Sequence, residues 1–209
     1  MTVNDQDTAD DRTDVFRRRL LQGLAASIEE RGYRDTTVAD IVRHAQTSRR
    51  TFYQHFDSKE TCIAALLMET SREILAFVTA AVDSTAPWAT QVQQAIEAWF
   101  HANEARAALA LTWVSEVPSL GLAARTLQRD MAAGFIDLVV AICDTEKSRA
   151  AGAAPASRDL AALLLAGLRE LTAAVAEQSL PMSEAIELGV DASIRLLGPP
   201  AERTNDSLE

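Results

Sequence analysis

Three helix-start signals lie close together within residues 36–60, and they constrain the fold more than any other stretch of the chain. Thr37 is followed three residues later by Asp40, which is the spacing of a capping box. Ser48 and Asp57 are good N-cap residues at the starts of two further apolar segments. The pattern predicts two short helices joined by a brief turn, followed by a longer helix.

A further amphipathic helix is predicted directly before this segment. Within residues 14–31, apolar side chains recur every three or four positions from Phe16 to Ile28, which places them on one face. Gly32 follows, where a left-handed residue commonly ends a helix. The stretch therefore predicts a three-helix unit in which the second and third helices form a helix-turn-helix.

The third of these helices has an apolar side and a polar side. At about 100° per residue, Phe52 and Phe56 lie together and face inward, while Arg50 and Gln54 lie opposite. Arginine can bond guanine and glutamine can bond adenine, while hydroxyl and basic side chains at the edges can hold phosphates. The candidate DNA contacts are therefore Thr37, Ser48, Arg49, Arg50, Thr51, Tyr53, Gln54, His55 and Lys59. The competing interpretation is an ordinary solvated surface helix.

The charge of the chain is unevenly distributed. The net charge of −10 on its own argues against a nucleic-acid partner. However, residues 1–11 hold four aspartates and no base, whereas residues 12–56 hold nine arginines against five acids. The positive charge therefore lies in the segment with the helix-turn-helix pattern, although surface charge often serves solvation alone.

The remaining sequence predicts helices without reaction chemistry. Alanine and leucine dominate the 48% hydrophobic content and aromatics make up 5%, which favours an all-α fold. No nucleophile elbow, phosphate loop or HExxH motif occurs, so we predict no enzyme, no catalytic residue, no metal and no cofactor. Glu97 and His101 lie four apart and leave a weak metal or acid–base role open beside the simpler surface pair. The polar N-terminus and two isolated cysteines are typical of a cytoplasmic protein, and no apolar run predicts a membrane span.

Large aromatic residues gather in the middle of the chain. As a pocket lining they would suit a flat, apolar ligand. Filling the core is the commoner role of any single aromatic residue, and both interpretations stay open. The candidate ligand contacts are Trp99, Phe100, Trp113 and Phe135.

Two Ala- and Leu-rich helices are predicted over residues 158–178 and 182–197. Such a pair from each of two subunits can form a four-helix interface, and the same stripes can equally form an intramolecular core. The candidate interface residues are Leu160, Leu164, Leu168, Leu188 and Ile194.

Residues 14–66 resemble the N-terminal domain of the tetracycline-repressor (TetR) family of bacterial transcriptional regulators. The resemblance rests on Gly32, the Thr36–Thr37 pair, Ile41 and Ala45, the run Ser48–Phe56, and Asp57–Glu60. The remainder of the chain agrees only in length and helical character. Gln46 and Arg50 are departures, since the family commonly has glycine at both places. A non-glycine residue at position 46 is expected to adopt a left-handed conformation or to reshape the turn.

The resemblance implies a ligand-responsive repressor: a homodimer that binds a palindromic double-stranded DNA operator and is released by a small-molecule effector. It implies a helix-turn-helix DNA-binding domain at residues 13–58 and a helical effector-binding and dimerisation domain at 59–198. The acidic, polar composition of residues 1–12 predicts a disordered leader, and residues 199–209 are expected to form a flexible tail. The alternative is a helical small-molecule-binding or scaffold protein whose helix-turn-helix does not bind DNA. The acidic charge of the whole chain favours that alternative.

Overall fold

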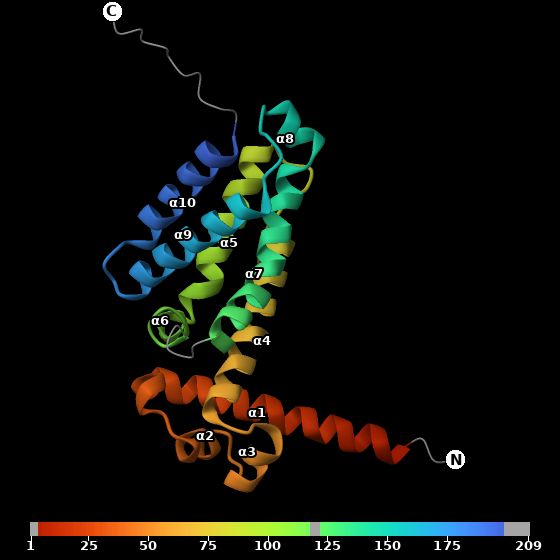
Figure 1. Ribbon diagram of the computed structural model, residues 1–209, viewed down its shortest axis with the longest axis vertical. Helices are drawn as coiled ribbons and strands as arrows, with labels where there is room; N and C mark the ends of the chain where they lie inside the picture. The colour runs from red at the N-terminus through yellow and green to blue at the C-terminus, as the bar shows by residue number, and fades with distance from the viewer. Residues whose placement is uncertain (1–3, 118–121, 199–209) are drawn as a thin grey trace, which may run out of the picture. The chain divides into compact units, whose positions relative to one another are not determined.

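The computed structural model describes residues 4–117 and 122–198, and no β-strand occurs in those ranges. The all-α class expected from the sequence is therefore confirmed. The helices, labelled in Figure 1, are α1 (Asn4–Asp35), α2 (Val38–His44), α3 (Arg49–His55), α4 (Lys59–Ala81), α5 (Trp88–Glu104), α6 (Ala107–Ser115), α7 (Leu122–Cys143), α8 (Glu146–Ala150), α9 (Arg158–Ala176) and α10 (Met182–Leu197). Over the same residues, no helix is both long and apolar enough to cross a membrane.

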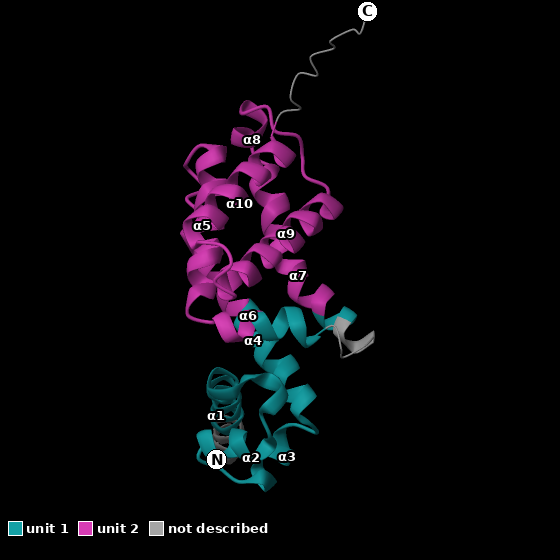
Figure 2. Ribbon diagram, turned by 90° about the vertical axis from the view of Figure 1, so that its left-hand side faces the viewer, with its two compact units in different colours: residues 1–71, 111–127 teal, residues 72–110, 128–209 magenta. Residues whose placement is uncertain are grey.

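Contacts within the chain define two compact units, which Figure 2 colours separately. Unit 1 comprises residues 1–71 and 111–127, and unit 2 comprises residues 72–110 and 128–209. The expected order, a helix-turn-helix followed by a helical region, is confirmed. Unit 1 ends at residue 71 and unit 2 begins at residue 72, both within α4. The domain boundary expected between residues 58 and 59 stays a prediction.

In unit 1, α1 packs against both α2 and α3. Leu24 of α1, Ile41 of α2 and Phe52 of α3 are all completely buried. The helices α1 and α2 cross closely at Gly23, where a Cβ would come within 2.6 Å of the carbonyl oxygen of Ile41 and 2.9 Å of the nitrogen of Ala45. Glycine at this place therefore allows the approach that positions the helix-turn-helix.

Helix α1 begins earlier than expected. Residues 4–12, which we expected to be disordered, continue the helix, and an acidic sequence near a helix N-terminus is electrostatically favourable. At its other end Gly32 leaves the helical conformation with φ 78°, so the positive φ expected of this residue is confirmed. The expected flexible tail, residues 199–209, lies outside the described residues.

The start of α4 corrects one capping prediction. Ser58, not Asp57, is the N-cap: its hydroxyl accepts from the nitrogen of Thr61 at 3.2 Å, and its own nitrogen donates to Thr61 Oγ1 at 3.1 Å. Its carbonyl also accepts the first intrahelical bond, from Cys62. Aspartate and serine are both good N-cap residues. Sequence preference alone therefore could not tell which of these two adjacent residues precedes the first turn of α4.

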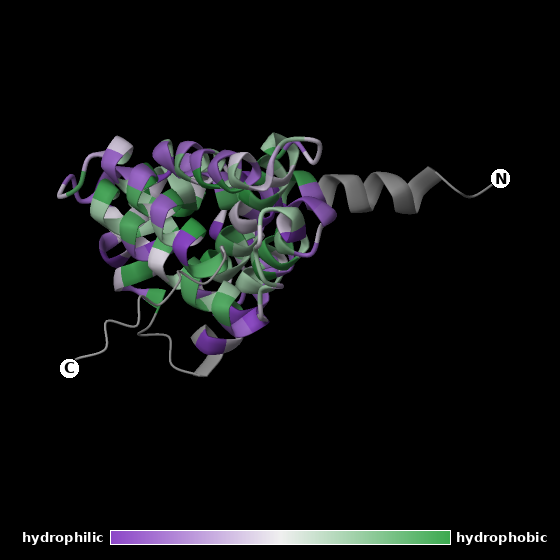
Figure 3. Ribbon diagram, turned by 90° about the horizontal axis from the view of Figure 1, so that it is seen from above, coloured by the Kyte–Doolittle hydropathy of each residue, from purple (hydrophilic) through white to green (hydrophobic). Residues whose placement is uncertain are grey.

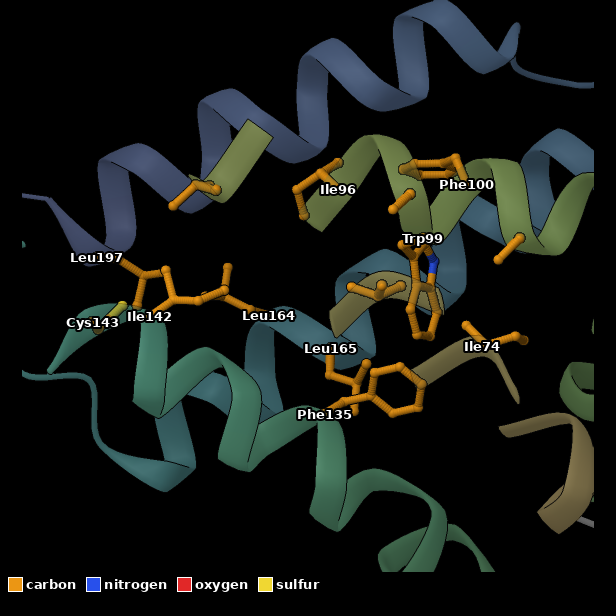
Figure 4. Close-up of a cluster of buried hydrophobic side chains, with 14 of the residues drawn as sticks. Ile74, Ile96, Trp99, Phe100, Phe135, Ile142, Cys143, Leu164, Leu165 and Leu197 are labelled. Carbon is orange, nitrogen blue, oxygen red and sulfur yellow. The ribbon is translucent and has the colours of Figure 1, made fainter. Parts of the chain in front are cut away.

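Unit 2 is built around α5, α9 and α10, which pack against one another. Figure 4 shows their apolar side chains meeting those of α4 and α7 in one cluster. Gly189 of α10 permits a close approach, since a Cβ there would lie 3.1 Å from Leu168 Cδ2 and 3.2 Å from Ile96 Cγ2. In Figure 3 polar and apolar residues share the same helices, as expected of helices with one buried face.

Most of the residues predicted at a dimer interface contribute instead to this core. The cluster includes Leu164, and packed against it are Leu160, Leu168 and Ile194. Leu188 is the one exposed member of the predicted set. Since a helix turns by about 100° per residue, the leucine stripe that faces α5 and α10 cannot also face outward, and the exposed leucine of α9 is Leu163.

Candidate nucleic-acid interface

Helix α3 has the two sides that its sequence predicted. Phe52 is completely buried and Phe56 is almost so, and their rings pack against each other with centroids 5.8 Å apart. Arg50 and Gln54 lie one turn apart on the opposite side, and both are exposed. The aromatic pair therefore anchors α3 in unit 1 and leaves the polar pair to face outward.

The arginines of unit 1 differ in whether an acid neutralises them. Those of α1 and α2 that form ion pairs are Arg17 with Glu69 (3.5 Å), Arg31 with Glu30 (2.9 Å), Arg34 with Glu116 (3.4 Å) and Arg43 with Glu30 (3.1 Å). Arg49 and Arg50 of α3 are exposed and make no ion pair or hydrogen bond to any described residue. Two adjacent uncompensated guanidinium groups give α3 a local positive charge that an anionic partner can neutralise.

The hydroxyl groups of the predicted interface take part in helix caps. Ser48 Oγ accepts from the nitrogen of Thr51 at 3.1 Å and lies 2.9 Å from Thr51 Oγ1. At the start of α2, Thr37 Oγ1 accepts from the nitrogen of Asp40 at 3.3 Å and donates to its carboxylate at 2.6 Å. Both predicted caps are confirmed, and they fix the start of each helix before any partner binds.

Lys59 makes contacts that the sequence did not reveal. Its Nζ donates to the backbone oxygens of Tyr33 (2.9 Å), Thr36 (2.9 Å) and Arg34 (3.4 Å), and it lies 4.3 Å from the centroid of the Tyr33 ring. An ammonium has three N–H donors, and these three oxygens account for all of them. Lys59 therefore stabilises the end of α1, and its expected contact with a phosphate stays a prediction.

Tyr53 and His55 lie on the flanks of α3. Tyr53 is 58% exposed, and its ring meets that of Phe52 edge to face with centroids 5.3 Å apart. His55 is half-buried at the last position of the helix. Tyr53 is therefore accessible to a partner, and a phosphate contact for either residue stays a prediction.

In the turn between α2 and α3, a residue other than glycine adopts the left-handed conformation. Gln46 has φ 50°, which agrees with the conformation expected where the resembling family has glycine, at a strain of about 1 kcal/mol for a non-glycine residue. Arg19 of α1 donates to the carbonyl oxygen of Gln46 at 3.3 Å. Arg17 lies over the Phe56 ring, 5.7 Å from its centroid. The sequence did not single out these arginines, because no local pattern tells which members of an arginine run face a neighbouring helix.

An ionic cluster joins α1 to α2. Glu30 lies 2.9 Å from His44 Nε2, and its carboxylate accepts from Arg31 at 2.9 Å and from Arg43 at 3.1 Å. The hydrogen bond with His44, followed by those from Arg31 and Arg43, lowers the pKa of Glu30 to about 2. Both arginines also reach Asp40, at 3.4 and 3.5 Å. The cluster thus connects the end of α1 to the helix that precedes the turn.

Three of the four predicted ligand contacts lie together in unit 2. Trp99 Nε1 donates to Thr172 Oγ1 at 2.8 Å, and the Trp99 and Phe135 rings meet edge to face with centroids 5.0 Å apart. Phe100 belongs to the same cluster, as Figure 4 shows. Trp113 is half-buried and belongs to unit 1. The three clustered residues build the core of unit 2, and a ligand role for any of the four stays a prediction.

The side chains of Glu97 and His101 do not pair. His101 Nδ1 lies 2.7 Å from the backbone oxygen of Glu97, whereas the Glu97 carboxylate accepts from Gln93 at 2.7 Å. In the part of the chain that the structure describes, no group of three or more His, Cys, Asp or Glu residues is placed to hold a metal ion.

Comparison of the sequence with known proteins identifies the same segment. Residues 20–66 match the family described as bacterial regulatory proteins, tetR family. Over 53 residues the chain is 38% identical to a Bacillus subtilis (strain 168) protein described as an uncharacterized HTH-type transcriptional regulator, YdgC. This match covers 25% of the chain and only 27% of that relative's length.

Similar solved structures cover most of the chain. The transcriptional regulator FadR from Bacillus subtilis, in complex with stearoyl-CoA, superposes with a TM-score of 0.73 at 14% identity and covers 86% of this chain and 98% of that one. A putative TetR-family regulator from Syntrophomonas wolfei gives a TM-score of 0.72 at 15% identity, with 87% and 94% covered. At such low identities the likeness establishes the fold alone.

Proposed function

The N-terminal domain of this chain belongs to the tetR family of bacterial regulatory proteins, and from this premise we propose that the chain is a ligand-responsive transcriptional repressor. In the cytoplasm the protein binds, as a homodimer, a palindromic operator in double-stranded DNA, and a small effector releases it from that DNA. One observation carries the proposal: α3 presents two unneutralised arginines beside an exposed glutamine. In the same unit, four arginines of α1 and α2 are paired with acids.

Helix α3 is suited to this role because contacts within unit 1 hold it in place before DNA binds. Phe52 and Phe56 hold its inner side, and the Ser48 cap holds its start. The outward side chains can then contact base edges in a major groove, while flanking residues such as Tyr53 contact phosphates. A rigidly held helix loses little conformational freedom when it binds.

A second copy of the chain is expected to cover the outward face of α9 and α10. Leu163 is 61% exposed, Leu188 is 51% exposed and Leu196 is 48% exposed, and the two helices pack side by side. At Gly167 no atom lies within 4 Å of a built Cβ, so the backbone of α9 is open to a close neighbour. Apolar side chains exposed on adjacent helices favour a four-helix contact with the same pair from a partner.

The effector is expected to bind in unit 2, among its aromatic residues. Trp99, Phe100 and Phe135 offer an apolar environment, with the hydroxyl of Thr172 beside them. The similarly folded FadR holds stearoyl-CoA, which supports an apolar effector here. Such a molecule releases DNA only to the extent that it binds the DNA-free state more tightly than the DNA-bound state.

Salt dependence of DNA binding tests the proposal. The full-length protein should bind a fragment from the region flanking its own gene, with an affinity that falls steeply as salt rises because phosphate contacts release counterions. Arg49→Ala should weaken binding and reduce the slope of log affinity against log salt by about 1. Arg149→Ala removes the same charge from an exposed side chain of α8, outside both α3 and the proposed dimer contact, and should leave both quantities unchanged. Fluorescence anisotropy measures both, and stearoyl-CoA added to the complex probes release.

The alternative, a helical ligand-binding or scaffold protein with an inactive helix-turn-helix, makes the opposite prediction. It is favoured if no fragment is bound in preference to random DNA, or if Arg49→Ala and Arg149→Ala reduce the affinity equally.

A further inference from the structure

We propose that Arg50 and Gln54 act as a pair that selects a guanine and a nearby adenine in each operator half-site, whereas Arg49 contacts the phosphate backbone. This inference rests on the proposed function, because it assigns bases to the same DNA-binding helix. It goes further by stating which bases the protein selects and which side chain selects each of them.

The pair is defined by its position on α3. Arg50 and Gln54 are four residues apart, so they lie on one face and are separated by about 6 Å along the helix axis. Phe52 and Phe56, which define the buried side, lie opposite them. Successive base pairs are about 3.4 Å apart, so two side chains with this separation reach base pairs one or two steps apart.

The chemistry of the two side chains determines the bases. A guanidinium presents two parallel N–H donors, which match O6 and N7 of guanine, and a carboxamide presents one donor and one acceptor, which match N7 and N6 of adenine. Neither side chain is hydrogen-bonded to another described residue, so neither must break an internal bond to reach a base. The first turn of α3 carries no acidic residue, and so no carboxylate competes there for Arg50.

The other polar residues of α3 are less suited to base selection. The hydroxyls of Ser48 and Thr51 are engaged with each other in the N-cap. Arg49 precedes Arg50 by one residue and so projects about 100° away around the axis, towards the side that Phe56 anchors. From the flank of the helix its charge is placed for phosphates, which carry no direct sequence information.

Selection from random-sequence DNA with full-length variants tests the assignment. The wild-type protein should select a palindrome with a guanine and an adenine within two base pairs of each other in each half. Arg50→Ala should lose the preference for that guanine alone and Gln54→Ala the preference for that adenine alone, each with a drop of roughly 10- to 100-fold in discrimination. Arg49→Ala is the matched control, since it should select the unchanged motif with lower affinity and a weaker salt dependence.

A gain of specificity provides a second readout. Gln54→Glu replaces the amide by a carboxylate of the same shape, which accepts from the N4 amino group of cytosine. Its preferred base at that position should change from adenine to cytosine. Thermal unfolding of each variant, followed by circular dichroism, shows whether it remains folded.

The outcomes separate this inference from the proposed function. If the wild-type protein selects a motif that Arg50→Ala and Gln54→Ala also select unchanged, the pair is not the reader, although DNA binding stands. A changed base preference in Arg49→Ala would likewise overturn the division of roles. If the wild-type protein selects no motif at all, the proposed function fails and this inference fails with it.

Discussion

Lys59 illustrates how a single residue can support the helix-turn-helix from outside it. Carbonyl oxygens at the end of a helix lack intrahelical donors, and α1 ends at Asp35, shortly after Gly32 leaves the helical conformation. The Lys59 ammonium bonds the backbone oxygens of Tyr33, Arg34 and Thr36, and it also lies against the ring of Tyr33. Burial raises the pKa of Tyr33 to about 12, so the phenol stays neutral beside this cation at physiological pH. The start of α4 is thereby connected to the end of α1.

We expect Lys59→Met, which keeps most of the side-chain length but removes the charge, to lower the free energy of unfolding by about 2 kcal/mol, because hydrogen bonds from a charged donor are lost. Urea unfolding of the full chain measures the effect. Arg72→Met, an exposed basic residue on the same helix, should change stability by less than about 0.5 kcal/mol. Equal unfolding midpoints for Lys59→Met and the wild-type protein would show that the three contacts contribute nothing.

At the scale of elements, the packing of α1 on α2 combines a close backbone crossing with an ionic cluster. Gly23 permits the crossing, and Glu30 with His44, Arg31 and Arg43 joins the two helices at the surface. Since α2 precedes the turn that leads to α3, these contacts help to determine how α3 is presented. Because Glu30 is a carboxylate at the centre of this cluster, we also expect the stability of the unit to depend on pH.

The pKa of Glu30 is lowered from 4.5 to about 2, first by His44 and then by Arg31 and Arg43. A carboxylate with a depressed pKa in the folded state stabilises the fold fully above its unfolded pKa, and this stabilisation is lost as the pH falls through the folded value. We therefore expect the urea midpoint of the wild-type protein to fall between about pH 4.5 and pH 2, and Glu30→Gln to show a smaller decline. The neighbouring Glu29 makes no ion pair with a described residue, so Glu29→Gln should follow the wild-type profile. Identical profiles for all three proteins would exclude a role for the cluster.

In the whole molecule, the helices α9 and α10 each have one face packed in the core of unit 2 and another that is exposed. Leu164 and Leu165 enter the core of unit 2, while Leu163 and Leu188 remain exposed. A repressor that reads a palindrome requires two copies with matching faces, and the outer face is the apolar surface available on these helices.

Charge introduced on the two faces should have different consequences. We expect Leu163→Glu and Leu188→Glu to give a folded monomer, because each places a charge in the proposed contact without disturbing the core. Leu164→Glu should instead give an unfolded or insoluble chain, because that side chain is 8% exposed and a buried unpaired carboxylate is strongly destabilising. Light scattering with circular dichroism distinguishes these states. Stable dimers from both outer-face variants would mean that the copies meet elsewhere.

Features that depend only on neighbours along the chain were predictable before the fold was known. The capping box of Thr37, the cap of Ser48 and the break at Gly32 all occur where the sequence predicted them. The opposed sides of α3 were likewise predictable, since Phe52 and Phe56 are buried where Arg50 and Gln54 are exposed. Capping and helical periodicity act over three or four residues, so one segment contains all the information that they require.

Contacts between residues that are far apart in the sequence became evident only from the fold. Lys59 bonds oxygens up to 26 positions earlier, and His44 meets Glu30 across 14 positions. The periodic leucines of α9 could belong to a core or to an interface until the positions of α5 and α10 placed Leu164 inside and Leu163 outside. The spacing of apolar residues along a helix predicts which of them share a face. Only the packing of several helices determines what that face contacts.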